Sequence, residues 1–130
     1  MTVGYSKRPR LDKLGVEPGM RVSILGVADA AFRRELATRT REVSEGRARR
    51  DSALVFYGVD DARRLARLAA LRGQIARDGA IWVVWPKGRK HISENMIRDA
   101  ALAAGLVDIK VVAFSESLSG LKLVIPVAQR

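Results

Sequence analysis

The stretch Ala80-Ile81-Trp82-Val83-Val84-Trp85 is followed directly by Pro86-Lys87-Gly88-Arg89-Lys90-His91, and this pair of segments decides the fold. The first segment is continuously apolar, which is typical of a strand buried on both faces of a parallel sheet. The second segment is a basic loop that leaves this strand. In open α/β folds, ligands sit where loops leave the carboxyl ends of parallel strands. The stretch therefore predicts an α/β sheet with a candidate site at this edge, although no motif in the chain specifies a reaction.

Apolar runs separated by turn signals predict six strands in all. They are expected at residues 20–25, 38–43, 53–57, 80–85, 106–114 and 121–125. The second strand is the weakest prediction, because Thr and Val alternate there with Arg and Glu, as at the edge of a sheet. The last two strands are joined by a short Ser-rich connection, so they are expected to form an antiparallel hairpin.

Helix signals lie between these strands. Residues 11–14 can form one helical turn, and Asp29 is a good N-cap for a short helix. Asp60 or Asp61 is expected to cap a longer helix that ends before Asp78-Gly79, and Ser93 one that ends at Gly105. The apolar stripe of the longer helix consists of Leu65, Leu68, Leu71 and Ile75.

The order of these elements predicts an α/β fold of three layers: a doubly wound, Rossmann-like, mostly parallel sheet of about six strands with a C-terminal antiparallel hairpin. Residues 11–130 are expected to form a single domain. Residues 1–10 are polar and without periodicity, so they are expected to form a flexible N-terminal arm.

Composition excludes several kinds of chemistry. The chain has no cysteine and a single histidine, so it can form neither a disulfide, nor a thiolate nucleophile, nor a centre with several histidine ligands. No metal site is therefore predicted. No apolar run has the length of a membrane span, and no apolar segment follows the charged N-terminus, so a cytoplasmic location is expected.

A net charge of +10 favours polyanionic partners. The cations are spread along the chain, with arginine clusters at 47–50 and 63–67, and only the fold decides whether they form one patch. Aromatic side chains are too few for a base-stacking platform. The charge therefore predicts weak, nonspecific nucleic-acid binding at most.

Two stretches resemble class I S-adenosylmethionine-dependent methyltransferases. One is Leu14-Gly15-Val16-Glu17-Pro18-Gly19-Met20-Arg21-Val22 with Leu25-Gly26, and the other is Asp78-Gly79-Ala80-Ile81-Trp82-Val83. The resemblance implies a truncated form of that Rossmann-like fold. The whole chain also resembles a family of small bacterial proteins of unknown function, through Tyr5-Ser6, Trp85-Pro86-Lys87 and Ser119-Gly120-Leu121-Lys122.

The candidate site combines this resemblance with topology. Gly26, Gly58 and Trp85 end parallel strands, so the loops that follow them are expected to meet at the carboxyl edge. The predicted cofactor-binding set is Gly26, Ala28, Asp29, Glu45, Gly58 and Trp85, with S-adenosylmethionine as the possible cofactor. The predicted anion-binding set is Lys87, Arg89, Lys90 and His91. The alternative interpretation is that the glycines only relieve crowding, Trp85 packs against a helix and the cations are solvated.

Two residues differ from the methyltransferase pattern, and they argue against methyltransferase activity. Ile24 stands where these enzymes have an acidic residue, and Ala28 adds a side chain where glycine lets the cofactor approach the backbone. The sequence therefore predicts a domain without methyltransferase activity that binds a small anionic ligand or a macromolecular partner. The alternatives are a minimal methyltransferase or other nucleoside-cofactor enzyme, and a weak, nonspecific nucleic-acid-binding module.

Overall fold

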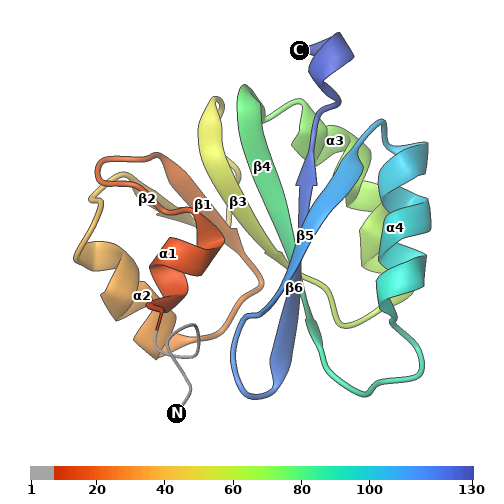
Figure 1. Cartoon of the computed structure of the whole chain (residues 1–130), viewed down its shortest axis with the longest axis horizontal. Helices are drawn as coiled ribbons and strands as arrows, with labels where there is room; N and C mark the ends of the chain where they lie inside the picture. The colour runs from red at the N-terminus through yellow and green to blue at the C-terminus, as the bar shows by residue number, and fades with distance from the viewer. Residues whose placement is uncertain (1–7) are drawn as a thin grey trace.

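The computed structural model describes residues 8–130 and contains one six-stranded sheet in the order β2-β1-β3-β4-β6-β5 (Figure 1). The strands are β1 Val22–Leu25, β2 Val43–Glu45, β3 Ser52–Gly58, β4 Ile75–Pro86, β5 Val107–Ala113 and β6 Leu118–Val124. β2, β1, β3 and β4 are parallel, whereas β6 runs antiparallel to both β4 and β5. The predicted mostly parallel sheet with a C-terminal antiparallel hairpin is confirmed.

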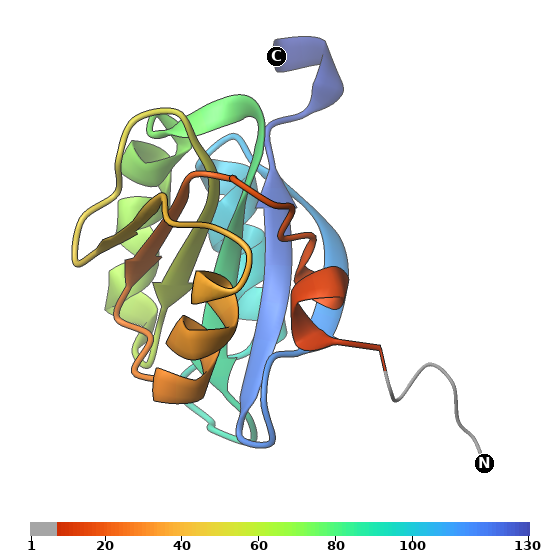
Figure 2. The same cartoon turned by 90° about the vertical axis from the view of Figure 1, so that its left-hand side faces the viewer.

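Helices cover both faces of the sheet, as predicted for three layers. α1 (Arg10–Leu14) and α2 (Ala30–Ala37) lie on one face, and α3 (Leu68–Arg72) and α4 (Glu94–Ala103) lie on the other (Figures 1 and 2). Two 3₁₀ helices complete the set, η2 (Ala62–Arg67) and η3 (Val127–Gln129). Within residues 8–130, none of the helices combines the length and apolar character needed to cross a membrane.

β4 contributes to a hydrophobic core on each face, because its side chains alternate. Trp82 packs with Phe32 and Phe56 on the α1 and α2 side, and Trp85 packs with Ile92 and Ile97 on the α4 side. Each large apolar side chain that is fully buried contributes about 1.5–3 kcal/mol. This two-sided burial explains why the stretch at 80–85 is continuously apolar.

Both helix caps predicted at Asp29 and Ser93 are present. The Asp29 carboxylate accepts a hydrogen bond from the Phe32 amide at 2.9 Å, and the Ser93 hydroxyl accepts one from the Met96 amide at 3.3 Å. Arg10 was assigned to the N-terminal arm, but here it begins α1. The rest of the predicted arm, residues 1–7, lies outside the described part of the chain.

The second strand is displaced from its predicted position. Residues 38–43 were expected to form it, whereas β2 is the short segment Val43–Glu45. The amides of Thr38, Arg39 and Thr40 bond instead to carbonyls of Glu35 and Leu36 at the end of α2. The last helical turn thus takes the backbone donors that the expected strand would have needed.

The prediction of one long helix between Asp61 and Asp78 is also wrong for the second half of that range. The helical region consists of η2 and α3 and stops at Gly73, and Ile75 begins β4, opposite Ser52. Asp78-Gly79, expected to follow the helix, lies within β4 at a β-bulge. A Cβ at Gly79 would lie 2.9 Å from the carbonyl oxygens of Ser52 and Ala53, so this close approach of two strands requires glycine.

Residues 46–51, which we call the crossover segment, join β2 to β3 across β1. A connection between parallel strands usually contains a helix and takes a dozen or more residues. Here six residues suffice, and they carry no helix. The crossover segment therefore leaves part of the α3 and α4 face of the sheet open.

Candidate functional site

The carboxyl edge of the sheet contains the small cavity that the topology predicts, which we call the crevice. It has a volume of about 290 Å³ and brings together the ends of β1, β3 and β4 with the start of β6. Its lining residues are Gly26, Val27, Ala28, Gly58, Val59, Asp60, Arg64, Val84, Pro86 and Leu118. Of the predicted cofactor set, Gly26, Ala28 and Gly58 thus lie together at this cavity.

Direct backbone contact narrows the crevice between β1 and β3. A Cβ built on Gly58 would lie 2.2 Å from the Gly26 carbonyl oxygen, so only glycine fits at this position. The one cation of the lining, Arg64, is paired with Asp60 at 3.3 Å. The rest of the lining is mainly apolar, so the crevice offers little free charge to an anion.

Asp29, Glu45 and Trp85 complete the predicted cofactor set, and the structure places them outside the crevice lining. Glu45 pairs with Arg33, and Trp85 is buried in the core beneath α4. Asp29 accepts hydrogen bonds from the Phe32 amide and from Arg10, whose guanidinium lies 3.1 Å away. Burial opposes the ionisation of Asp29, but these hydrogen bonds outweigh it and hold its pKa below the ordinary value.

The basic loop after β4 does not converge on the crevice. The Lys87 ammonium donates a hydrogen bond to the Ser115 carbonyl at 3.0 Å, which ties it to the β5–β6 turn. Arg89, Lys90 and His91 are exposed and take no part in the ion pairs of residues 8–130. Anion binding by these four residues stays a prediction.

S-adenosylmethionine is a poor match to this edge. A nucleoside cofactor is usually held by a carboxylate that accepts hydrogen bonds from ribose hydroxyls, whereas Asp29 is engaged by Arg10 and the Phe32 amide, and one oxygen of Glu45 is paired with Arg33. The volume of the crevice is at the lower end of the range for small-ligand pockets, about 300–1,000 Å³.

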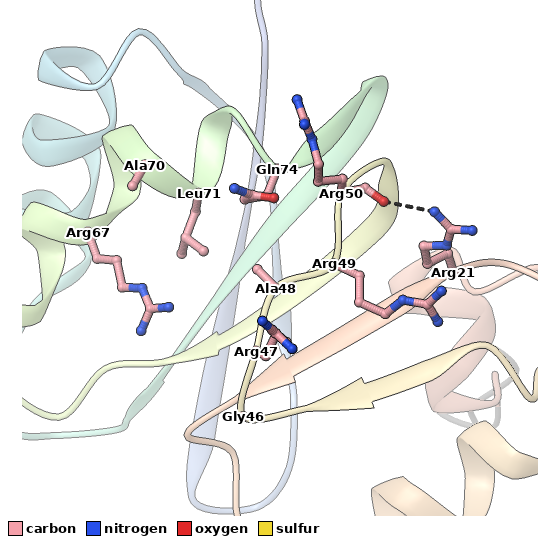
Figure 3. Close-up of a pocket in the computed structure, with 10 residues that line it drawn as sticks. All are labelled: Arg21, Gly46, Arg47, Ala48, Arg49, Arg50, Arg67, Ala70, Leu71 and Gln74. Carbon is pink, nitrogen blue, oxygen red and sulfur yellow. Dashed lines mark hydrogen bonds between the residues drawn. The ribbon is translucent and has the colours of Figure 1, made fainter.

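A larger cavity, which we call the arginine groove, lies between the crossover segment and α3 (Figure 3). Its volume is about 770 Å³, and its two walls come from segments roughly twenty positions apart in the chain. The lining residues are Arg21, Gly46, Arg47, Ala48, Arg49, Arg50, Arg67, Ala70, Leu71 and Gln74. The groove forms where the missing crossover helix would otherwise cover the sheet.

A closed ring of hydrogen bonds fixes the backbone of the crossover segment. The Arg49 amide donates to the Ser23 hydroxyl at 3.0 Å, and the Ser52 hydroxyl donates to the Arg49 carbonyl at 2.6 Å. The two hydroxyls lie 2.8 Å apart, and the Ser23 hydroxyl donates because the Ser52 proton is already used. Both serines are fully buried. The ring therefore holds the arginines that flank it in one arrangement.

The arginines of the groove are only partly neutralised. Arg21 and Arg49 each lie 3.8 Å from the Glu42 carboxylate, which is a long contact. In the described part of the chain, no carboxylate pairs with Arg47, Arg50 or Arg67, and all three are exposed. Guanidinium groups form bidentate hydrogen bonds with phosphates and stay charged at all physiological pH values. Chemically, the groove can therefore hold an anion with several phosphates.

The sequence showed both arginine clusters that contribute to this groove, but it did not show that they lie on opposite walls of one cavity. The clusters at 47–50 and 63–67 are separate in the chain, and the fold brings the first of them to face Arg67. Arg63 and Arg64, by contrast, pair with Asp61 and Asp60. Hydrogen bonds from Arg63 lower the pKa of Asp61 to about 2. No group of three potential metal ligands occurs within residues 8–130.

Several solved structures with a similar fold are described as methyltransferases. One from Aquifex aeolicus has a TM-score of 0.67 at 12% identity, covering 87% of this chain and 86% of that protein. A TehB-like enzyme from Corynebacterium glutamicum has a TM-score of 0.58 at 12% identity, covering 89% and 85%. Fibrillarin from Aeropyrum pernix, solved with natively bound S-adenosyl-L-methionine, has a TM-score of 0.55 at 16% identity, covering 83% and 67%. At these identities the likeness shows the fold alone, and it confirms the Rossmann-like, methyltransferase-like architecture.

Sequence comparison gives one family match. The model of a family described as "Protein of unknown function (DUF3052)" matches residues 11–127. No curated protein sequence matches the chain.

Proposed function

This chain belongs to the family of unknown function DUF3052, and we propose that it is a non-enzymatic binding domain whose arginine groove holds a phosphate-bearing polyanion. The observation that carries the proposal is the set of five arginines on the two walls of one groove. Three of them, Arg47, Arg50 and Arg67, have no carboxylate partner in the described residues. The cytoplasm, where nucleic acids and other polyphosphates occur, is the location we propose.

The absence of methyltransferase activity is part of the same proposal. It is supported by the contact between Gly26 and Gly58 and by the pairing of Asp29 and Glu45 with arginines. In this account the domain keeps the fold of its enzyme neighbours while its binding surface lies on the sheet face, away from the carboxyl edge.

Binding of inorganic polyphosphate tests the proposal. We expect saturable binding of labelled polyphosphate in fluorescence anisotropy, weakened by salt as arginine–phosphate contacts are screened. The triple variant Arg47→Ala, Arg50→Ala and Arg67→Ala should bind at least about tenfold more weakly, which corresponds to about 0.5 kcal/mol for each exposed contact. Absence of saturable binding by the wild type at low salt, or equal binding by the triple variant, would contradict the proposal.

The second candidate function is that of a minimal methyltransferase, favoured by the neighbour with bound S-adenosyl-L-methionine. Calorimetric titration with S-adenosylmethionine and S-adenosylhomocysteine separates the two candidates. Our account expects no heat of binding at millimolar ligand. Saturable binding that is weakened by Glu45→Ala would instead favour the enzyme.

A further inference from the structure

We infer that the polyanion in the arginine groove is a nucleic-acid duplex, bound through its phosphate backbone. The inference rests on the proposed function of the groove and narrows its ligand to one class. Three features of the described surface carry it: the absence of an exposed phenylalanine, tyrosine or tryptophan, the placement of the exposed apolar side chains, and the distribution of the cations over two walls.

Single-stranded nucleic acid is usually bound on a stacking surface, and residues 8–130 expose no phenylalanine, tyrosine or tryptophan to form one. Proteins that bind single strands usually stack the bases on aromatic side chains. Between residues 8 and 130 every phenylalanine, tyrosine and tryptophan is buried, with Trp85 the most accessible at 6%, and the exposed His91 lies outside the groove lining. A duplex already stacks its own bases and presents phosphates outward, so it requires only cations from the protein.

An anionic membrane surface is disfavoured by the apolar side chains. Membrane-surface proteins insert exposed apolar residues beside their cations. The large exposed apolar residues of the described chain are Met96, Leu102, Ile109, Val111 and Val127, and all five lie outside the groove lining. The groove is also hollow, whereas a membrane surface is nearly flat.

A single small phosphate compound would leave most of the cations unused. Arg47 and Arg50 come from the crossover segment, whereas Arg67 comes from η2 on the opposite wall. No described aromatic side chain lines the groove to hold a nucleobase, and the apolar lining is limited to Ala48, Ala70 and Leu71. Cations on two walls fit a ligand that repeats its phosphates, as a duplex backbone does.

The expected salt dependence follows from counterion release. The logarithm of affinity for duplex DNA falls with the logarithm of salt by about 0.9 for each phosphate contact, and by about 0.7 for single strands. Three to five arginine contacts give a slope between about −2.7 and −4.5. Replacement of one phosphate-contacting arginine should reduce this slope by about 1 without changing any sequence preference.

The test compares a labelled DNA duplex, an RNA duplex and the single strand of the same sequence by fluorescence anisotropy over a salt series. We expect both duplexes to bind more tightly than the single strand at every salt concentration, and the slope to become shallower in Arg47→Ala. Arg34→Ala removes another exposed charge from α2 on the other face of the sheet, so it should leave the slope unchanged. Comparison of the DNA duplex with the RNA duplex shows which of the two nucleic acids supplies the phosphates.

Each outcome separates this inference from the proposed function. Tight binding of polyphosphate with no binding of either duplex would overturn the inference and leave the proposed function standing. A single strand that binds as tightly as the duplexes would also overturn it. If neither polyphosphate nor any nucleic acid binds, both claims fail. Thermal unfolding of each variant checks that the exposed substitutions leave the fold intact, since such changes usually shift stability by less than about 0.5 kcal/mol.

Discussion

Gly58 shows how one residue without a side chain determines the shape of the carboxyl edge. Its Cα packs against the Gly26 carbonyl so closely that an added methyl group would lie 2.2 Å from the oxygen. The barrier is backbone on backbone, so no flexible side chain can move away. At the residue scale, this contact is the physical reason that the crevice is narrow.

Gly58→Ala should therefore destabilise the domain by more than about 2 kcal/mol, at the upper end of the cost of overpacking. Urea unfolding measures the change in the free energy of unfolding. Gly73→Ala is the matched control, because its Cβ would meet only the Ala70 carbonyl at 3.5 Å and its φ of −74° suits alanine. The control should change stability by no more than about 1 kcal/mol, in the stabilising direction. If the two substitutions change the free energy of unfolding equally, Gly58 is not in close contact with the Gly26 carbonyl and the account of this position is wrong.

Arg10 anchors the start of the described chain through two carboxylates. Its guanidinium pairs with Asp29 at 3.1 Å and with Glu35 at 2.6 Å, and it lies over the Phe32 and Phe114 rings. Hydrogen bonding to Glu35 is the main cause that raises the pKa of Arg10. The ion pairs are mostly shielded from water, so screening weakens them less than surface pairs.

Asp29→Asn isolates the charge of this pair, because asparagine is an equally good N-cap. The pKa of Asp29 is lower in the folded state, so its ionisation stabilises the fold above the unfolded pKa of about 3.9, and this contribution is lost as pH falls through the folded pKa. We expect the variant to be about 1–2 kcal/mol less stable at pH 7. The difference should shrink below about pH 4. A difference that is constant from pH 7 to pH 2 would show that Asp29 acts only through its cap.

At the element scale, local signals predicted most of the secondary structure. The run at 80–85, the caps Asp29 and Ser93 and the hairpin after Gly105 each depend on nearby residues, and each is present. The errors occur where two elements compete for the same backbone. The end of α2 takes the amides of residues 38–40, and pairing with Ser52 draws Ile75 into β4. The outcome of such competition depends on tertiary contacts, and these cannot be predicted from a local sequence pattern.

The crossover segment holds its arginines in position through the ring of Ser23, Ser52 and Arg49. Ser23→Ala should remove about 1–3 kcal/mol of stability, because it leaves the partly buried Arg49 amide without its acceptor and the buried Ser52 hydroxyl without its donor. It should also weaken polyphosphate binding, although Ser23 contacts no ligand itself.

Ser117→Ala, in the exposed β5–β6 turn, is the control for this loss of a hydroxyl and should change neither quantity. Chemical unfolding and anisotropy measure stability and binding in the same preparations. If Ser23→Ala lowers stability but leaves binding unchanged, the ring has a structural role only.

At the scale of the whole molecule, the fold class was predictable from the sequence, whereas the arginine groove was not. Topology predicted that loops meet at the carboxyl edge, and Gly26, Ala28 and Gly58 do line one crevice there. The alternative interpretation, that these glycines relieve crowding, fits the close contact of Gly58 with the Gly26 carbonyl, but the sequence did not show which backbone atoms would meet. The two walls of the arginine groove come from separate segments that the fold brings together. The distribution of charge along the sequence therefore could not locate the groove.

A net charge of +10 attracts polyanions to any face of the molecule, so the central claim needs a comparison at equal charge. The groove variant Arg47→Ala, Arg50→Ala and Arg67→Ala removes three positive charges. The control variant Arg34→Ala, Arg89→Ala and Lys90→Ala also removes three, from α2 and from the basic loop after β4. Each variant has a formal net charge of +7, which is +10 minus 3.

The decisive measurement is the affinity of these two variants and the wild type for labelled polyphosphate at one low salt concentration. Our account predicts that the groove variant binds at least about tenfold more weakly than the wild type, whereas the control variant loses less than about threefold through the change in net charge. Equal losses in the two variants would show that overall charge rather than the groove binds the polyanion. A larger loss in the control variant would move the site to the basic loop and contradict the account.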